Sequence, residues 1–307
     1  MSKLAHILKT LLGLLFIVSA ILKMVGMDQF ELYVYSYHFF SLNTAFIAAR
    51  IAIVLELVLG IGLLINRFHK PVWWSCVMML LAYTGLMVYA TAQGRTDNCH
   101  CFGELVKFNP WQTIIKNVVL LALFALVYKV QERSTKHKVL VLASIVIGCF
   151  AAVFFISPPD NFFYNDDPSY EFTDHNQLEY FMQTPPLDST GIREDKKLVG
   201  ILSSSCEYCM LAAKKIGLMQ EHLGFPEEDV LYVFMGTEEG VANFFVESES
   251  KPFPYVLYDD YIYLMKVTDG IFPFIVLLDN GKVIKEYDLR SMNENYIKAF
   301  FENTNEP

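Results

Sequence analysis

The sequence predicts a protein of two domains that differ in class: an all-α bundle of transmembrane helices, followed by an α/β domain. The chain has 307 residues, which is long enough for two domains. Hydrophobic residues make up 54% of it and the mean hydropathy is +0.34, yet the chain after about residue 158 has the composition of an ordinary soluble domain. The net charge is −9 and no basic run occurs, so nucleic acid is not an expected partner.

Five apolar segments have the length of a membrane span, about 20 residues each. They run over residues 4–25, 43–65, 71–92, 111–130 and 138–157. The first segment is preceded by Lys3, carries Lys9 near its start and has the composition of a signal peptide. Because four further spans follow it, we expect this segment to be retained as a helix.

The positive charges near the span ends predict the orientation in the membrane. Those on the N-terminal side are Lys3, Lys9, Arg67, Lys70, Lys129, Arg133, Lys136 and Lys138, against Lys23, Arg95 and Lys107 on the other side. This bias predicts a multi-pass protein of the inner (cytoplasmic) membrane, in contact with lipid, whose N-terminus is inside. The 93–110 loop and the second domain then lie outside, where disulfides form and persist.

Several single residues within the spans are unusual for a membrane helix and are interpreted one by one. Glu56 lies in the middle of the second span, where an ionisable side chain is costly, so it indicates either a functional site or a pair that fixes packing. Arg50 is near a span end and is expected to reach toward the membrane surface. Gly60 is expected at a close helix contact. Cys76 and Cys149 stand alone in apolar segments and are interpreted as small core residues.

A Cys-His-Cys run, Cys99 to Cys101, lies in the polar loop after the third span. A disulfide between cysteines this close closes a strained ring that is readily reduced. His100, when protonated, would favour the thiolate of its neighbours. Redox exchange is the favoured interpretation; a static disulfide and a soft-metal site of two thiolates and one imidazole are the alternatives.

Four stretches of the first half, "LLGLLFIVSAILKMV", "LELVLGIGLLI", "CHCFGE" and "IIKNVVLLAL", resemble the MauE family within the wider DoxX-like group. The resemblance covers about residues 4–130 and implies a four-helix bundle that moves disulfides or reducing equivalents during the maturation of exported proteins. It also implies that Cys99 and Cys101 are the redox pair and that Glu56 and Asn117 are polar positions inside the bundle. By analogy no bound cofactor is required, and a membrane quinone would carry electrons onward, past Glu56.

The second half reads as alternating strands and helices. "KKLVGILSSS" predicts a strand, "CEYCMLAAKKIGLMQEHLG" a helix, "DVLYVFMG" a strand and "VANFFVES" a short helix. "FPFIVLLDNGKVIKEYDL" predicts two strands joined by an Asp-Asn-Gly turn. Cys206 and Cys209 open the first of these helices, where the helix dipole and unpaired amides stabilise a thiolate. Cys206 is the expected nucleophile and Cys209 the resolving thiol.

A strand, then a Cys-x-x-Cys helix, then a hairpin is an order that resembles the thioredoxin fold, over about residues 165–307. By this resemblance Phe272-Pro273 would be the cis-proline step opposite the cysteines, where substrates dock. Ser205 stands where the family often has Trp, Phe272 is larger than usual, and the distance along the chain from Cys206 to Pro273 implies an insertion. The expected domains are 1–135 (four-helix bundle), 136–160 (fifth span), 161–195 (linker and lead-in) and 196–307 (thioredoxin-like).

These features together predict a membrane thiol–disulfide oxidoreductase. Its Cys206/Cys209 pair would exchange with Cys99/Cys101 and serve exported or periplasmic thiol proteins. A carrier or assembly factor for copper or zinc is the alternative, and a bundle that acts only as an anchor is a third hypothesis. Cys-x-x-Cys sites serve oxidants and reductants alike, so the spacing predicts no direction of electron flow.

Overall fold

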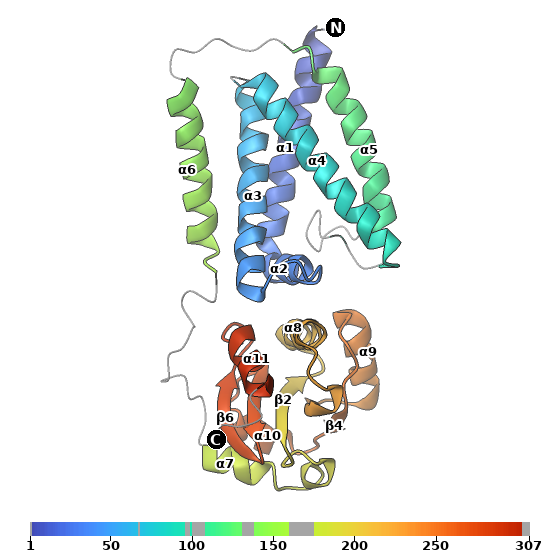
Figure 1. Ribbon diagram of the computed structural model, residues 1–307, viewed down its shortest axis with the longest axis vertical. Coiled ribbons are helices and arrows are strands. Elements are labelled where there is room, and N and C mark those ends of the chain that lie inside the picture. Colours follow the sequence, from blue (N-terminus) through green and yellow to red (C-terminus); the bar gives the residue numbers. More distant parts are fainter. Residues whose placement is uncertain are drawn as a thin grey trace. The chain divides into compact units, whose positions relative to one another are not determined.

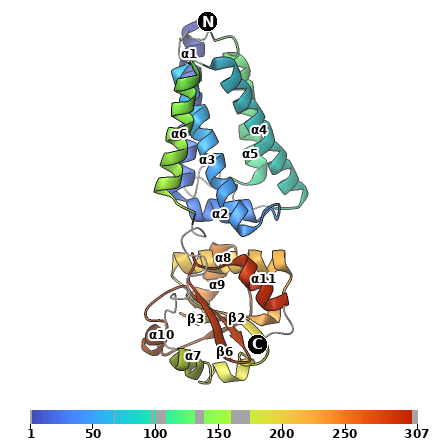
Figure 2. The ribbon, with the colours of Figure 1, turned by 60° about the vertical axis from the view of Figure 1, so that its left-hand side comes forward.

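A computed structural model describes the chain in two compact units, residues 1–159 and residues 160–307 (Figures 1 and 2). The residues described are 2–66, 68–95, 99, 108–130, 138–159 and 175–302.

The first unit is a bundle of long apolar helices (Figure 1). Its helices are α1 (Ser2–Val25), α2 (Met27–Tyr35), α3 (Leu42–Ile65), α4 (His69–Ala92), α5 (Pro110–Val127) and α6 (Lys138–Ile156). Among the described residues, five of these, all but α2, are long and apolar enough to cross a membrane. The predicted bundle and fifth span are therefore confirmed. The short helix α2 was not foreseen.

Helices α1 and α3 pack closely through glycine. A Cβ atom placed on Gly60 of α3 would lie 2.7 Å from Cγ1 of Ile17 and 2.9 Å from the carbonyl oxygen of Gly13, both on α1. Such distances leave no room for a side chain, so the two backbones can approach only because both positions are glycine. The expected role of Gly60 at a close helix contact is confirmed.

Arg50 of α3 does not reach the membrane surface, contrary to the expectation from sequence. Only 2% of its surface is exposed, and it forms a buried ion pair with Glu31 of α2. Its guanidinium also donates to the carbonyl oxygens of Ser157 (2.7 Å) and Pro158 (2.9 Å), just after α6. The unforeseen helix α2 supplies the carboxylate that makes burial of this charge acceptable.

The second unit is a five-stranded mixed sheet with helices on both faces (Figure 2). Its elements are α7 (His175–Phe181), a 3₁₀ turn (Leu187–Thr190), β2 (Lys196–Ser203), α8 (Glu207–Leu223), a 3₁₀ turn (Glu227–Asp229), β3 (Val230–Met235), α9 (Glu238–Ser248), β4 (Tyr255–Leu257), α10 (Tyr261–Val267), β5 (Phe274–Asp279), β6 (Lys282–Tyr287) and α11 (Glu294–Glu302). The strand order is β4-β3-β2-β5-β6; β2, β3 and β4 are parallel, while β5 and β6 run antiparallel to their neighbours.

The predicted β-α-β and hairpin segments are all present. Asn280 and Gly281 both have positive φ, at 50° and 79°, as the tight turn between β5 and β6 requires. Between β3 and β5 the chain forms α9, β4 and α10 in place of a single helix, which accounts for the long separation between the cysteines and Pro273. The thioredoxin-like fold is confirmed.

One face of the sheet is covered by α7 and α10 and the other by α8, α9 and α11 (Figure 2). Leu178 and Phe181 of α7 and Leu187 of the following turn are fully buried in the core beneath the first of these faces. Within the range predicted as linker and lead-in, residues 175–192 therefore belong to the folded domain. Their apolar side chains are spaced too irregularly to have revealed this from sequence.

Candidate thiol–disulfide sites

Cys206 is the N-cap residue of α8 and follows β2, the central strand of the sheet, after a two-residue turn of Ser204 and Ser205. Cys206 is partly exposed, and its sulfur lies near the Cys209 thiol and near the backbone amides of Tyr208 and Cys209 in the first turn of α8, although no amide forms a capping hydrogen bond to it. The Cys209 hydrogen bond is the largest influence. Together these groups lower the pKa of the Cys206 thiol to about 6, against a smaller opposing effect of burial. The exposed cysteine is therefore largely a thiolate at neutral pH.

Cys209 lies one turn further along α8 and is fully buried. Its hydrogen bond to Cys206 and its burial both raise the pKa of the Cys209 thiol far above the ordinary range. The backbone amide of Ser203 donates to this sulfur (3.3 Å) and partly offsets the effect. One exposed thiolate beside one buried thiol is the arrangement expected of a nucleophile and a resolving cysteine.

The loops around Cys206 are tightly packed. The amide of Ser204 donates to the carbonyl oxygen of Met235 (3.0 Å), and a Cβ on Gly236 would lie 2.1 Å from Oγ of Ser204.

Pro273 is buried, its peptide bond with Phe272 is cis, and it directly precedes β5.

The position of Pro273 follows from the strand register. Phe274 pairs with Ile201 across β5 and β2, so Pro273 flanks the end of the strand that leads to Cys206. Phe272 is partly buried and packs against the core of the domain. The expected docking step therefore lies at the start of β5, next to the end of the strand that leads to Cys206.

Cys99 is buried in the apolar core of the membrane unit. Its amide donates to the carbonyl oxygen of Phe108 (2.9 Å), and the hydroxyl of Thr113, in the first turn of α5, donates to its sulfur (2.9 Å). The sequence analysis did not identify Thr113. Its place in the first turn of α5, four residues after the N-cap residue Asn109, was the available signal that it lies near the loop. His100 and Cys101, predicted with Cys99, lie outside the described residues.

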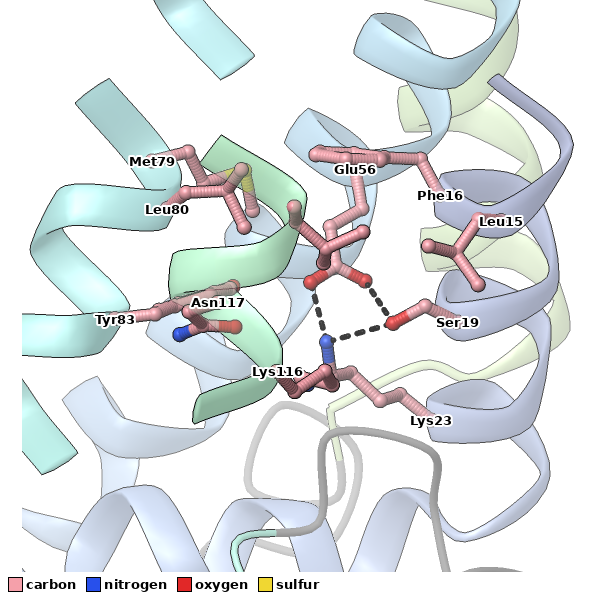
Figure 3. Close-up of a pocket in the computed structure, with 11 residues that line it drawn as sticks. Leu15, Phe16, Ser19, Lys23, Glu56, Met79, Leu80, Tyr83, Lys116 and Asn117 are labelled. Carbon is pink, nitrogen blue, oxygen red and sulfur yellow. Dashed lines mark hydrogen bonds and ion pairs between the residues drawn. The ribbon is translucent and has the colours of Figure 1, made fainter. Parts of the chain in front are cut away.

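Glu56 and Asn117, both predicted as polar positions inside the bundle, line one small cavity of about 40 Å³ (Figure 3). Glu56 is ion-paired with Lys23 and accepts a hydrogen bond from Ser19 (3.1 Å); Lys23 also donates to Ser19 (3.2 Å). Asn117 donates to the hydroxyl of Thr84 (3.1 Å). Lys23, counted above among the outer charges, is thus a buried partner of Glu56. Two opposite charges in neighbouring spans were the signal that could have revealed this pair.

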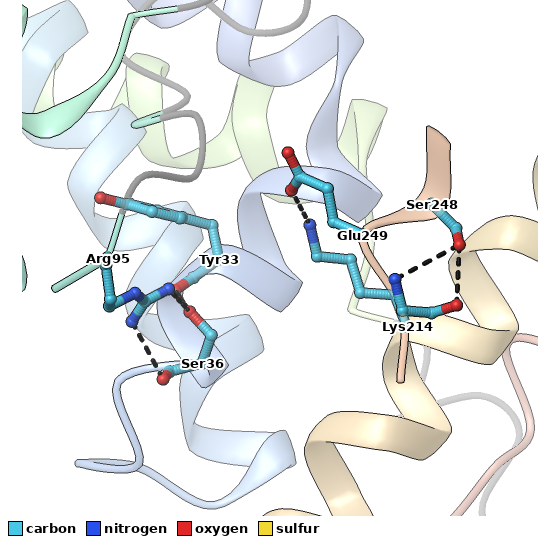
Figure 4. A network of polar contacts seen from close by, with 7 residues as sticks. Tyr33, Ser36, Arg95, Lys214, Ser248 and Glu249 are labelled. Atoms are coloured by element: carbon cyan, nitrogen blue, oxygen red, sulfur yellow. Dashed lines mark hydrogen bonds and ion pairs between the residues drawn. The ribbon is translucent and has the colours of Figure 1, made fainter. Parts of the chain in front are cut away.

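An aromatic group next to Cys99 was also missed. Tyr33 and Tyr37, on and just after α2, share a hydrogen bond between their hydroxyls (2.7 Å). The guanidinium carbon of Arg95 lies 4.6 Å from the ring centroid of Tyr37 and 5.9 Å from that of Tyr33, and Arg95 is fixed by hydrogen bonds to Ser36 (Figure 4). These tyrosines and Cys99 belong to the same core cluster.

The metal alternative requires at least three ligand side chains that converge on one point. Within those residues, no three His, Cys, Asp or Glu side chains converge as metal ligands do. Among the described residues, no third ligand of this kind joins Cys206 and Cys209, and Cys101 and His100 are not among the residues described.

Comparison with known proteins covers both halves of the chain. Residues 1–129 match the family model "Methylamine utilisation protein MauE". The chain is also 27% identical, over 333 aligned positions, to "Protein TlpB" of Flavobacterium psychrophilum, an alignment that covers 92% of this chain and 87% of the relative. The five apolar helices and the family match show that this chain is a multi-pass membrane protein. The chain thus joins a MauE-like membrane domain to a thioredoxin-like domain.

Proposed function

We propose that this protein is a membrane thiol–disulfide oxidoreductase in which the Cys206/Cys209 pair exchanges with the Cys99/Cys101 pair. The observation that carries the proposal is the opposite environment of Cys206 and Cys209, one an accessible thiolate and the other a buried thiol. The similarity to "Protein TlpB" across both domains supports a function that needs both of them.

The exchange proceeds through a mixed disulfide. The Cys206 thiolate attacks one sulfur of a Cys99–Cys101 disulfide, so that one new S–S bond forms and the other cysteine leaves as a thiolate. Cys209 then loses its proton and attacks Cys206, which closes the Cys206–Cys209 disulfide and leaves Cys99 and Cys101 reduced. Two electrons have then moved from the thioredoxin-like domain to the bundle, and the same steps run in reverse.

The proposed arrangement places both pairs outside the cytoplasm, in the inner membrane, with the N-terminus inside. The bias of Lys and Arg along the loops supports this orientation. Exported or periplasmic proteins with exposed thiols or disulfides are the proposed substrates, and the cis-proline step at Phe272-Pro273 is the proposed place where they dock.

The exchange is tested by trapping its intermediate. In the Cys209→Ser variant, a disulfide made by Cys206 cannot be resolved. Membranes carrying this variant are quenched in acid, and disulfide-linked peptides are mapped by mass spectrometry. We expect a link from Cys206 to Cys99 or Cys101, and its loss when both of those cysteines are also replaced by serine.

The matched control is Cys149→Ser in the same background, because Cys149 is a buried thiol of the same bundle that takes no part in the proposed exchange. The link should persist in this control. If Cys206 is instead found free or joined only to other proteins, the two halves do not exchange.

A further inference from the structure

The membrane unit contains a second and larger cavity, of about 200 Å³, to which the proposed exchange assigns no role. Its wall is mainly aromatic and aliphatic. The lining includes Phe30, Tyr33, Tyr37, Tyr83 and Ala52, and the exposed rings of Phe39 and Phe40 lie at its rim. An apolar protein cavity of about 150 Å³ holds one benzene molecule, so this cavity has room for a single substituted ring.

Two reactive groups line this cavity. Cys99 is one of them, and its sulfur is held by the hydrogen bond from Thr113. Lys23 is the other: its Nζ lies 5.5 Å from the ring centroid of Phe30 and 5.4 Å from that of Tyr83, and both rings are part of the wall. A thiol, a cation and flat aromatic surfaces therefore meet in one apolar site inside a membrane domain.

The chemistry of these groups selects one class of ligand. A dithiol that becomes a disulfide releases two electrons and two protons, so its partner must accept both. A partner that reaches a cavity within the apolar bundle from the lipid must itself be apolar, and stacking on Tyr and Phe requires a flat ring. A carbonyl oxygen beside Lys23 would gain a charge-assisted hydrogen bond as it becomes reduced. We infer that the cavity next to Cys99 binds the ring of a membrane quinone, which oxidises the Cys99/Cys101 pair.

The step balances in atoms and electrons. Cys99 and Cys101 lose two protons and two electrons and form one S–S bond, and the quinone gains both and becomes a quinol. Lys23 positions the quinone carbonyl and stays paired with Glu56. This inference rests on the proposed exchange and deepens it by giving it a direction, from substrate thiols toward the membrane.

The test uses a substitution that fills the cavity with a larger side chain and leaves its polar groups unchanged. Ala52 lines the cavity, whereas Ile51, next to it on α3, is exposed on the outside of the bundle. Full-length protein is placed in lipid nanodiscs, reduced, and mixed with decyl-ubiquinone or a short-chain menaquinone. Disulfide formation in the peptide that contains Cys99 and Cys101 is followed by mass spectrometry. We expect Ala52→Phe to slow this oxidation at least about tenfold, a loss of about 1.4 kcal/mol of binding, and Ile51→Phe to leave it unchanged.

A binding measurement keeps the inference testable if Ala52→Phe does not fold. In a Cys101→Ser variant the pair cannot close a disulfide, and decyl-ubiquinone, whose ring carbons are all substituted, cannot add to a thiol. At ten times its Kd the quinone should slow alkylation of Cys99 by N-ethylmaleimide about tenfold. Alkylation of Cys206 should not change.

The outcomes separate this inference from the proposed exchange. If the trapped Cys206 link forms normally but neither quinone protects Cys99 or oxidises the pair, the quinone site is wrong and the exchange stands. If the quinones act on Cys99 while no Cys206 link forms, the exchange is wrong and the site stands. Protection that is equal in wild-type and Ala52→Phe protein would place the quinone elsewhere and would overturn the inference.

Discussion

Cys206 and Cys209 lie one helical turn apart, yet the fold gives their sulfurs different surroundings. Cys206 is the N-cap residue of α8, where backbone amides without a helical partner favour a negative charge on its sulfur. Cys209 lies beneath it, away from water. The hydrogen bond between them lowers the pKa of one thiol and raises that of the other, so each cysteine helps to define the role of its neighbour.

Alkylation of the reduced protein should therefore depend on pH in a specific way. Only the thiolate reacts, and the Cys206 pKa is lowered to about 6, so the rate at Cys206 should rise through pH 6 and level off near neutrality. Iodoacetamide labelling, followed by mass spectrometry at a series of pH values, measures this. Cys209 should stay unlabelled over the same range.

The Cys209→Ala variant provides the control, because it removes the largest cause of the lowered pKa. The midpoint at Cys206 should then move up toward the ordinary thiol value, about 8.5. An unchanged midpoint would mean that the backbone amides alone hold the thiolate.

At the scale of the elements, charge pairs and glycines decide how the bundle packs. Arg50 of α3 is joined to Glu31 of α2, and Lys23 of α1 to Glu56 of α3. Each pair joins two helices inside apolar surroundings, where a charge without its partner is costly.

Removing one member of the first pair should destabilise the bundle strongly. Glu31→Gln leaves Arg50 buried with no counter-charge, and the expected loss is about 3–5 kcal/mol in the free energy of unfolding. Thermal unfolding in detergent measures it. The double variant Glu31→Met/Arg50→Met should recover most of the loss, because no isolated charge remains.

Gly60 offers a second test at the same scale. Gly60→Ala places a methyl group within 3 Å of the α1 backbone, so α1 must move away from α3, at a cost of about 1–3 kcal/mol. Gly85→Ala on α4 is the matched control, since a Cβ there meets nothing within 4 Å. Equal melting temperatures for the two variants would contradict the close contact.

The sequence predicts the parts of this fold that depend on local pattern. Spans follow from length and hydropathy, and the Cys-x-x-Cys helix and the hairpin at Asn280-Gly281 follow from short motifs. Glu56 stands out as a buried charge, but its partner Lys23 lies 33 positions away and becomes a partner only when α1 and α3 pack. The same holds for Glu31 and Arg50, and for the approach of Tyr33 and Tyr37 to Cys99. Two opposite charges in neighbouring spans can suggest a pair such as Lys23 and Glu56, but no short stretch of sequence shows which distant residues meet.

At the scale of the whole molecule, one chain carries two thiol pairs on separate domains. A tether turns their encounter into an intramolecular event at an effective concentration of roughly millimolar. The effect of the tether can be measured by inserting a protease site between residues 159 and 175, so that the two domains are separated by cleavage after purification. At micromolar protein, cleavage should slow the exchange by about 10³-fold and make it concentration-dependent.

The uncut protein with the same inserted site is the control, and stopped-flow measurements of thiol oxidation follow the rate. Equal rates before and after cleavage would show that the domains hold together without the covalent connection.

The hydrogen bonds from Arg50 to the carbonyl oxygens of Ser157 and Pro158 limit how far the thioredoxin-like domain can move from the bundle. They join the end of α6 to α3, so the chain that continues to the second domain leaves the bundle from a fixed point. From Pro159 to His175 the backbone can extend at most about 55 Å. A thioredoxin-like domain cannot reach the bundle of a second copy that lies beyond this distance. We therefore expect each thioredoxin-like domain to exchange electrons chiefly with its own bundle.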